Sequence, residues 1–252
     1  LVALAKVTPA GMLIFFPSYS VMETCLEEWG GPASASKKND KKNNFFASRS
    51  RNQAGKFSFP HIPNHFASNP ASHTTPWKRL LSIKSVVVEP KSSSDLHDAL
   101  ADFTKFLGQQ NSHGCVLMGV CRGKISEGID FANEQSRAVV ITGLPFPPSF
   151  DPKVKMKREF LDNAKAIGNA KPSTVGGFGV QATKADKLSG HEWYTQQAHR
   201  AVNQAIGRVI RNQSDYGAVL LMDSRFVQSS NQAGLSKWIR PYIRKDEGFG
   251  VA

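Results

Sequence analysis

Short apolar runs that alternate with helical patterns constrain the fold of this chain more than any other feature. The runs consist mainly of large apolar residues and glycine, at residues 11–16 (GMLIFF), 114–120 (GCVLMGV), 138–143 (AVVITG) and 217–222 (GAVLLM). Runs of this length are typical of strands buried on both faces, as in a parallel sheet covered by helices. A shorter run at 86–88 has the same character. The sequence therefore predicts an α/β fold with a mostly parallel sheet and helices on both faces.

Amphipathic patterns between these runs predict the helices. They lie at residues 21–29, 77–84, 96–107, 154–164, 191–211 and 234–239, and Ser20 is the predicted cap of the first. In the long 191–211 pattern, Val202 and Ile206 lie on an apolar stripe. The other side of that helix is predicted to present Arg200, Gln204, Arg208 and Arg211. We expect the stripe to pack on the sheet and the polar side to face a ligand or solvent.

Two segments lack any sustained periodicity. Residues 30–76 are rich in Ser, Asn, Lys, Pro and Gly, and are predicted to form a disordered, basic, low-complexity insert. Residues 167–187 are predicted to form a glycine-rich loop. A regulatory insert and a translated non-coding segment would have the same composition, so the sequence leaves both explanations open for 30–76.

The charge balance is strongly basic. Lysine and arginine outnumber aspartate and glutamate by 32 to 20, which gives a formal net charge of +12. Such a balance favours a polyanionic partner, because each neutralised phosphate releases counterions. Seven of the basic residues, against Asp40 alone, lie in the insert. Part of the excess therefore lies outside the expected folded body.

The apolar runs and the cysteines indicate the cellular compartment in which the protein is expected to reside. No run reaches the roughly 18 residues of a membrane span, and the N-terminus lacks a secretory signal, so we expect no membrane partner. Cys25, Cys115 and Cys121 have neither metal-ligand spacing nor an even number for a disulfide framework. The sequence thus predicts no metal site and favours a reduced, intracellular compartment. Because it begins with Leu1 inside a pattern, we expect the chain to be a fragment.

The segment 122–131 (RGKISEGIDF) follows a predicted strand, at the end where open α/β sheets bind ligands. Gly123 and Gly128 would let backbone amides approach a phosphate. Glu127 and Asp130 could reach a hydroxyl, a metal-bound water or a partner arginine. The residues around Gly123 do not match a phosphate-binding P-loop, which needs an earlier glycine and a Ser or Thr after the lysine.

Two further segments carry candidate functional side chains. The arginines of the 191–211 helix suit the charge on a transferred phosphoryl group, since a guanidinium offers several donors and stays ionised. A solvated basic face is the simpler alternative. In 15–19 (FFPSY), Ser18 and Tyr19 could contact a phosphate and stack on a base. A plain turn with a packed tyrosine is the alternative there.

Taken together, the three segments resemble the C-terminal motor domain of superfamily 2 DNA helicases of the XPD-like, iron–sulfur-containing type. FFPSY is similar to helicase motif IV, GKISEGIDF to motif V, and QAIGRVIR at 204–211 to motif VI. The resemblance extends over residues 11–250 apart from the two loose segments. It implies that 1–252 is a second RecA-like helicase lobe.

The resemblance also implies roles for particular residues. Arg208 and Arg211 would reach the phosphates of ATP as arginine fingers, with Gln204 beside them. Residues that would bridge the nucleotide site to the DNA groove are Glu127, Gly128 and Asp130. Residues that would contact DNA are Ser18, Tyr19, Arg122, Lys124 and Ser126.

The implied reaction is hydrolysis of ATP with Mg²⁺, which drives 5′-to-3′ movement on single-stranded DNA and the unwinding of forked DNA. The family acts in DNA repair or telomere maintenance, which implies a nuclear protein. The Walker A and D-E-A-H sequences and the four cysteines of a 4Fe–4S cluster are not in this chain. The resemblance assigns them to a missing N-terminal lobe, so this chain alone should be inactive. The alternatives are a non-catalytic nucleic-acid-binding remnant of the same fold and an unrelated α/β protein.

Overall fold

A computed structural model describes residues 1–32, 75–109, 113–131, 133–169, 188–208, 210 and 215–245, with the side chains of 167–169 left out. The chain divides into two compact units. Unit 1 comprises Leu1–Gly143 and Gln204–Asp223, and unit 2 comprises Leu144–Asn203 and Ser224–Ala252. Most of the predicted insert, most of the predicted glycine-rich loop and Arg211 lie outside the described residues.

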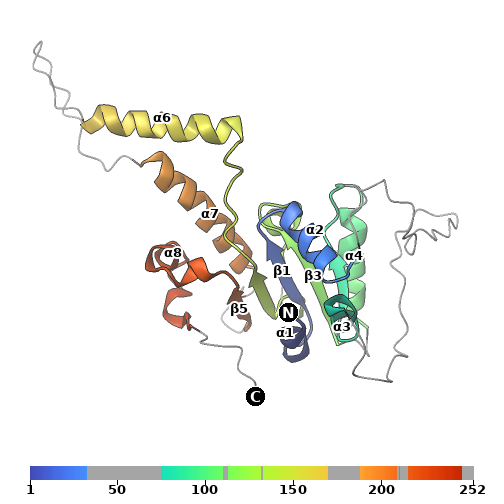
Figure 1. The fold of residues 1–252 in the computed structure, drawn as a ribbon. Helices are drawn as coiled ribbons and strands as arrows, with labels where there is room; N and C mark the ends of the chain where they lie inside the picture. The colour runs from blue at the N-terminus through green and yellow to red at the C-terminus, as the bar shows by residue number, and fades with distance from the viewer. Residues whose placement is uncertain are drawn as a thin grey trace, which may run out of the picture. The chain divides into compact units, whose positions relative to one another are not determined.

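Unit 1 is built on a parallel sheet of five strands (Figure 1). The strands are β1 (Met12–Phe16), β2 (Ser85–Val88), β3 (Cys115–Val120), β4 (Ala138–Ile141) and β5 (Ala218–Leu221). Their order across the sheet is β2-β3-β1-β4-β5, and every pairing is parallel. All five strands fall on the predicted apolar runs. In the central strand β1 every residue is buried, as a strand covered on both faces requires.

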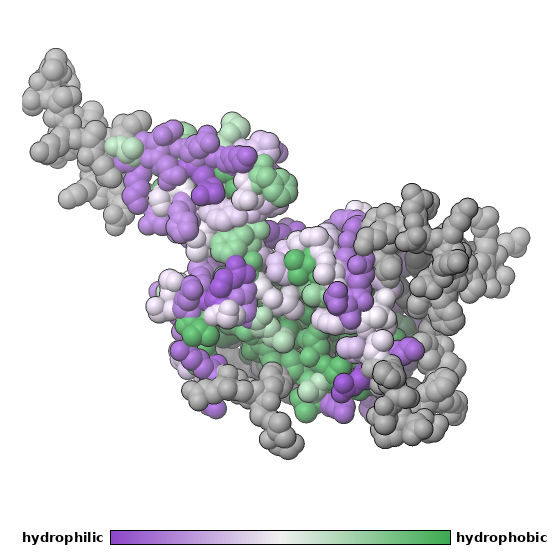
Figure 2. All heavy atoms as spheres, viewed as in Figure 1, coloured by the Kyte–Doolittle hydropathy of each residue, from purple (hydrophilic) through white to green (hydrophobic). Residues whose placement is uncertain are grey.

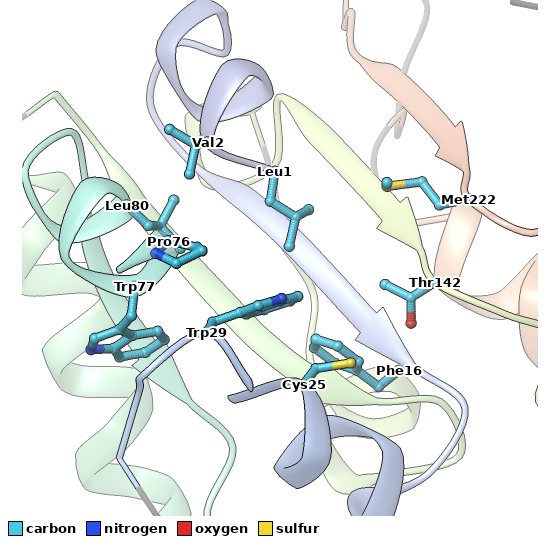
Figure 3. A pocket seen from close by; sticks show the side chains of 10 residues that line it. All are labelled: Leu1, Val2, Phe16, Cys25, Trp29, Pro76, Trp77, Leu80, Thr142 and Met222. Carbon is cyan, nitrogen blue, oxygen red and sulfur yellow. The ribbon is translucent and has the colours of Figure 1, made fainter. Parts of the chain in front are cut away.

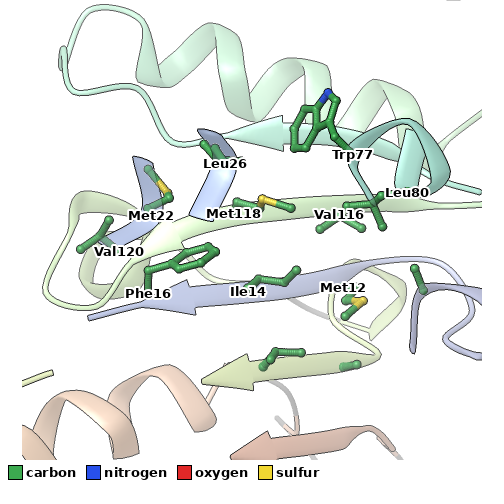
Figure 4. Packing of buried hydrophobic residues seen from close by; sticks show 13 residues of the cluster. Met12, Ile14, Phe16, Met22, Leu26, Trp77, Leu80, Val116, Met118 and Val120 are labelled. Atoms are coloured by element: carbon green, nitrogen blue, oxygen red, sulfur yellow. The ribbon is translucent and has the colours of Figure 1, made fainter. Parts of the chain in front are cut away.

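Helices cover both faces of this sheet, as predicted. On one face lie α1 (Val2–Val7), α2 (Tyr19–Glu28) and α3 (Pro76–Leu81), whose apolar residues pack against alternate strand residues such as Ile14 and Met118 (Figure 4). α4 (Leu96–Leu107) contacts β2 and β3 outside this cluster. Ile125 of α5 (Lys124–Gly128) lies beside Phe15, on the other face. The alternation along each strand thus divides the core into two layers.

The ends of the predicted insert are joined in unit 1. The backbone N–H of Trp77 donates to the carbonyl of Trp29 at 3.0 Å. Gly30 turns the chain at a φ of +73°, in the left-handed region that favours glycine. Thr75 caps α3 by accepting from the N–H of Lys78 at 3.3 Å. The chain on the two sides of residues 33–74 is therefore joined by a direct hydrogen bond within unit 1.

Unit 2 contains α6 (Pro152–Asn169), α7 (Gly190–Ile206, which ends in unit 1) and α8 (Ser229–Ala233). Tyr194 is central to its packing. Its hydroxyl donates to the carbonyl of Pro147 at 2.7 Å, and its ring stacks on Phe146 at 5.2 Å. The guanidinium of Arg158 lies 5.0 Å from the centre of the same ring. This unit thus brings together the chain after β4, α6 and α7, and Figure 2 shows a mostly hydrophilic surface along α6.

A capping box begins α7. The backbone N–H of Glu192 donates to the Ser189 hydroxyl at 3.2 Å, and the Glu192 carboxylate accepts from the Ser189 backbone and hydroxyl at 2.7 and 2.6 Å. Hydrogen bonds from Ser189 and from Lys165 lower the pKa of the Glu192 carboxyl to about 2. The S-x-x-E spacing at 189–192 is the local sequence signal for this helix start.

Several predicted helix boundaries are wrong. α2 begins at Tyr19 and is capped by Ser18 rather than by Ser20. α6 continues to Asn169, so 167–169 are helical rather than part of the predicted loop. Residues 234–239 are not a helix, because Gly234 ends α8 and the N–H of Ser236 donates instead to the side chain of Asn203 at 2.8 Å.

The most consequential correction concerns α7, which ends at Ile206 rather than at Arg211. Gly207 follows directly, and glycine costs a helix about 1 kcal/mol relative to alanine. The N–H of Arg208 then donates to the carbonyl of Ala205 at 3.2 Å, a tight turn rather than a continued helix. Arg208 therefore does not share a helical face with Arg200 and Gln204.

An apolar pocket of about 310 Å³ opens on unit 1 (Figure 3). Its lining comprises Leu1, Val2, Phe16, Cys25, Trp29, Pro76, Trp77, Leu80, Thr142 and Met222. Figure 2 shows apolar side chains gathered on this side of the unit. Cys25 lies at the pocket surface, whereas Cys115 and Cys121 are buried in and just after β3.

We expect an alkylating reagent at pH 8 to modify Cys25 well before Cys115 or Cys121. Burial raises the pKa of each buried thiol to about 12, so only about one molecule in ten thousand would carry the reactive thiolate there. Burial also raises the pKa of Cys25, but the pocket leaves its sulfur accessible. Mass spectrometry of the labelled peptides, with and without denaturant, measures the order. Native-state labelling of Cys121 as fast as that of Cys25 would contradict it.

Candidate functional site

The carboxyl ends of the parallel strands meet at one edge of unit 1 (Figure 1). Ser18 and Tyr19 follow β1, Glu89 follows β2, and the 121–130 segment follows β3. This edge is where open α/β sheets bind ligands. The predicted motifs IV and V therefore lie at the same edge, together with a carboxylate that the sequence analysis did not identify.

Ser18 and Tyr19 both have contacts within the unit. The Ser18 hydroxyl accepts from the N–H of Val21 at 3.3 Å, as the cap of α2, and lies 2.9 Å from the Ser20 hydroxyl. The Tyr19 side chain is partly buried and lies within the electrostatic influence of Glu89. Desolvation by burial and the nearby negative charge of Glu89 raise the pKa of Tyr19 to about 12.

Glu89 is a buried carboxylate, 3% exposed, directly after β2. Its Oε2 accepts from the backbone N–H of Val120 at 2.7 Å, and its Oε1 accepts from that of Ile125 at 3.4 Å. Only one sequence signal could have identified it: Glu89 is the first charged residue after an apolar strand, at the carboxyl end of a predicted parallel sheet. The Val86–Val88 run indicates a strand but no role for the residue that follows it.

The turn between β3 and α5 is shaped by its backbone. Arg122 has a φ of +63°, which is uncommon for a residue with a side chain. At Gly123 a Cβ would lie 2.7 Å from Oε1 of Glu89, so only glycine fits beside that carboxylate. Lys124 is exposed, and its Nζ donates to the carbonyl of Lys91 at 3.2 Å. The buried Ser126 hydroxyl donates to the Gly123 carbonyl at 3.0 Å.

Arg208 joins the predicted motif VI to the predicted motif V. Its Nε and Nη2 donate to the carbonyl of Ser126 at 3.2 and 2.9 Å, and its Nη1 donates to the carbonyl of Ile129. Nη1 also pairs with the Asp130 carboxylate at 2.8 Å. The side chain of Arg208 is only 13% exposed, whereas that of Asp130 is 79% exposed. The planar guanidinium thus spans the carbonyls at the end of α5, a geometry that lysine cannot match.

The remaining candidate residues are exposed or lie outside the described residues. Glu127, Gly128 and Gln204 are exposed, the first two at the end of α5 and the third near the end of α7. The structure therefore joins Glu89, Ser126, Asp130 and Arg208 through hydrogen bonds of the 121–130 segment, and within the described residues no hydrogen bond runs from the Tyr19 hydroxyl to this segment. Arg211 lies outside the described residues.

Among the residues that the structure describes, no group of three or more His, Cys, Asp or Glu could hold a metal ion. Two of the three thiols are buried with raised pKa values, which disfavours the thiolate that a cluster needs. This chain's described residues therefore do not fit Mg²⁺ or a 4Fe–4S cluster by themselves. Over the same residues, no helix is long and apolar enough to cross a membrane.

Comparison with known proteins defines the class. A family model described as the helicase C-terminal domain matches residues 1–242. The chain belongs to this family, and its five-stranded parallel sheet covered by helices is the α/β fold that the sequence predicted.

Two relatives share about 40% sequence identity with this chain. A regulator of telomere elongation helicase 1 homolog from Arabidopsis thaliana is 40% identical over 250 residues, which cover 99% of this chain and 20% of that protein. The regulator of telomere elongation helicase 1 of Homo sapiens is 39% identical over 247 residues, 98% of this chain and 16% of that protein. The chain thus spans about a fifth or less of the length of these relatives.

The segments VVITGLPFPP and LSGHEWY, and residues 196–226, are similar to the regulator of telomere elongation helicase, with the Fanconi anaemia group J helicase as the alternative. Both relatives described above are named regulator of telomere elongation helicase 1, the plant protein as a homolog. Among solved structures, an XPD helicase aligns with 92% of this chain and 28% of its own, at 20% identity and a TM-score of 0.44.

Proposed function

We propose that this lobe is the second half of an ATP-driven DNA motor. The observation that carries the proposal is the contact of Arg208, from motif VI, with the carbonyls of Ser126 and Ile129 in motif V. In a two-lobed motor the second lobe delivers positive charge to a nucleotide held by the first. A rigid connection between motifs V and VI would make that delivery depend on the conformation of the DNA-binding edge.

In this proposal the two arginines have different roles. Arg208 already makes its hydrogen bonds within the lobe, so it would position the motif V segment. Arg211, three residues further on, would be the finger that reaches the phosphates of ATP, with Gln204 exposed nearby. Mg²⁺ and the 4Fe–4S cluster would be held by a first lobe, and Mg²⁺ would neutralise the developing phosphate charge.

The DNA-facing side of the lobe would include Ser18, Tyr19, Arg122, Lys124 and Ser126, with Glu127, Gly128 and Asp130 between the DNA and the nucleotide. The hydroxyls of Ser18 and Ser126 are engaged within the lobe, so these side chains would have to give up their present hydrogen bonds to contact DNA. Contacts to phosphates rather than to bases suit a motor that moves along any sequence. The net charge of +12 supports a polyanionic track.

We further propose 5′-to-3′ movement, unwinding of forked DNA and a nuclear role in DNA repair or telomere maintenance. The names of the relatives support a role at telomeres. The direction of movement follows from the resemblance to XPD-like helicases.

The test is ATP hydrolysis by the full-length protein with and without single-stranded DNA. We expect DNA to stimulate hydrolysis, and we expect strand separation of forked duplexes that carry a 5′ single-stranded tail but not of those with only a 3′ tail. Unwinding from the 3′ tail would reverse the proposed polarity. Salt-dependent DNA binding without stimulated hydrolysis would overturn the motor and favour a non-catalytic nucleic-acid-binding protein of the same fold.

A further inference from the structure

One face of α6 is exposed and combines large apolar side chains with lysines. Lys153, Met156, Lys157 and Phe160 recur at the spacing i, i+3, i+4 and i+7, which places them on one stripe of a helix. All four side chains are exposed, and Met156 and Phe160 are 68% and 64% exposed. We call these four residues the α6 stripe.

The opposite face of α6 packs within unit 2 and fixes which side the stripe presents to solvent. Val154 is buried, and the guanidinium of Arg158 lies 5.0 Å from the centre of the Tyr194 ring in α7. The Asp162 carboxylate accepts from the backbone N–H of Gly190, at the start of α7, at 2.8 Å. These contacts hold α6 against α7, so the α6 stripe is directed away from that packing.

The charges of the α6 stripe suit a polyanion. Both of its ionisable side chains are lysines, and Nζ of Lys157 lies 5.5 Å from the centre of the Phe160 ring. Over the described side chains of α6, the carboxylates are Glu159 and Asp162. Asp162 belongs to the opposite face, and Glu159 borders the stripe beside Met156, away from the lysines. The stripe therefore presents two cations and an aromatic ring side by side.

The composition and size of the α6 stripe favour a single nucleic-acid strand over a protein partner. Lysine is depleted in protein–protein interfaces, and specific interfaces bury more than about 1,000 Å². The stripe extends over only two helical turns, about 10 Å along the helix axis, and offers far less area. Sites for single-stranded nucleic acid combine aromatic side chains, on which bases stack, with cations that contact the backbone. The stripe has both.

We propose that the α6 stripe binds single-stranded nucleic acid, with one base stacked on Phe160 and neighbouring phosphates at Lys153 and Lys157. This inference rests on the proposed motor function, because the bound strand is the one along which the motor would move. It adds a site on unit 2 to the contacts proposed at the carboxyl edge of unit 1. The site reads no sequence, since every base has a face that can stack on the ring.

Substitutions of Phe160 in the full-length protein test the stacked base. We expect Phe160→Ala to weaken the binding of a fluorescein-labelled oligothymidylate about tenfold, within the range found when a stacking aromatic residue is replaced by alanine. Phe160→Leu should weaken binding as much, because leucine is apolar but has no ring face, and full affinity in that variant would overturn the stacking. In Phe160→Trp, unlabelled oligothymidylate should quench the new indole fluorescence in a saturable way, beyond any change in the wild type.

Substitutions of the lysines test the phosphate contacts through salt dependence. For a single strand, each phosphate contact contributes about 0.7 to the slope of log K against log salt concentration. We expect Lys153→Gln and Lys157→Gln each to reduce that slope by about this amount. Lys155→Gln is the matched control, because Lys155 is an exposed lysine of the same helix that lies off the stripe. Equal reductions in all three variants would show a general effect of charge and would overturn the assigned contacts.

The outcomes distinguish this site from the proposed motor function. All the substituted side chains are exposed, so each variant should unfold at close to the wild-type temperature, which thermal unfolding measures. A wild-type protein that does not bind the oligonucleotide would overturn the motor function and the site together. Wild-type binding, with normal affinity in Phe160→Ala and no added quenching in Phe160→Trp, would overturn only the site on α6 and would favour a protein partner for the stripe.

Discussion

Replacement of Arg211 by alanine in the full-length protein is expected to lower DNA-stimulated ATP hydrolysis by about 10³-fold or more. An arginine finger stabilises charge that develops only in the transition state, so its loss lowers the rate of the chemical step far more than it weakens binding. Single-stranded DNA affinity should therefore change little. Steady-state hydrolysis and fluorescence-anisotropy binding to a labelled oligonucleotide measure the two quantities separately.

Arg200→Ala is the matched control for this experiment. Arg200 is an exposed arginine of α7. Its replacement by alanine removes the same side chain as Arg211→Ala and changes the net charge by the same amount. We expect that variant to hydrolyse ATP at close to the wild-type rate. Equal losses in both variants would show that net charge is responsible, and wild-type turnover by Arg211→Ala would rule out the finger.

Replacement of Arg208 is expected to affect both stability and hydrolysis. Arg208→Ala leaves the carbonyls of Ser126 and Ile129 without their guanidinium partner, and hydrogen bonds to a charged group contribute about 1.5–3 kcal/mol each. We expect the free energy of unfolding to fall by about 2–4 kcal/mol and hydrolysis to fall by about 10²-fold, as displaced positioning groups commonly cause. Denaturant unfolding and steady-state kinetics measure the two effects.

Two further variants separate the planar fork of Arg208 from its charge. Arg208→Lys keeps the charge but cannot span both carbonyls, so we expect it to restore little of the lost activity. Asp130→Asn removes the exposed partner of the ion pair, and exposed pairs contribute only about 0–1 kcal/mol. Full activity of Arg208→Lys, or a stability loss in Asp130→Asn as large as in Arg208→Ala, would contradict the assigned geometry. Faster amide hydrogen exchange at 126–130 in Arg208→Ala would support it.

The different roles proposed for the two arginines follow from where α7 ends. A helix continued to Arg211 would place Arg208 and Arg211 three residues apart on one face, both directed to the same partner. Because the helix ends at Ile206, the side chain of Arg208 reaches back to α5. Gly207 is the sequence feature that permits this turn, but a single glycine inside a periodic pattern also occurs in continuous helices.

The candidate site was only partly predictable. The motif segments were recognised from residue types and spacing, and the strands that precede motifs IV and V placed both at the carboxyl edge. Glu89 was missed because a single glutamate after a short strand carries no distinctive spacing. The hydroxyls of Ser18 and Ser126 form hydrogen bonds within their own turns, as serines in turns commonly do without any ligand. The residue type alone therefore does not indicate a contact with DNA.

By itself, the sequence determined the class of fold, the positions of the strands and the family. That information is local: continuous apolar runs define buried strands, and motif wording is read from neighbouring residues. The tertiary structure alone decided which side chains meet. Arg208 reaches Ser126 across 82 residues, and Glu89 reaches Val120 across 31, because the sheet order β2-β3-β1-β4-β5 brings their elements together. Such contacts depend on the pairing of whole strands, which no short stretch of sequence encodes.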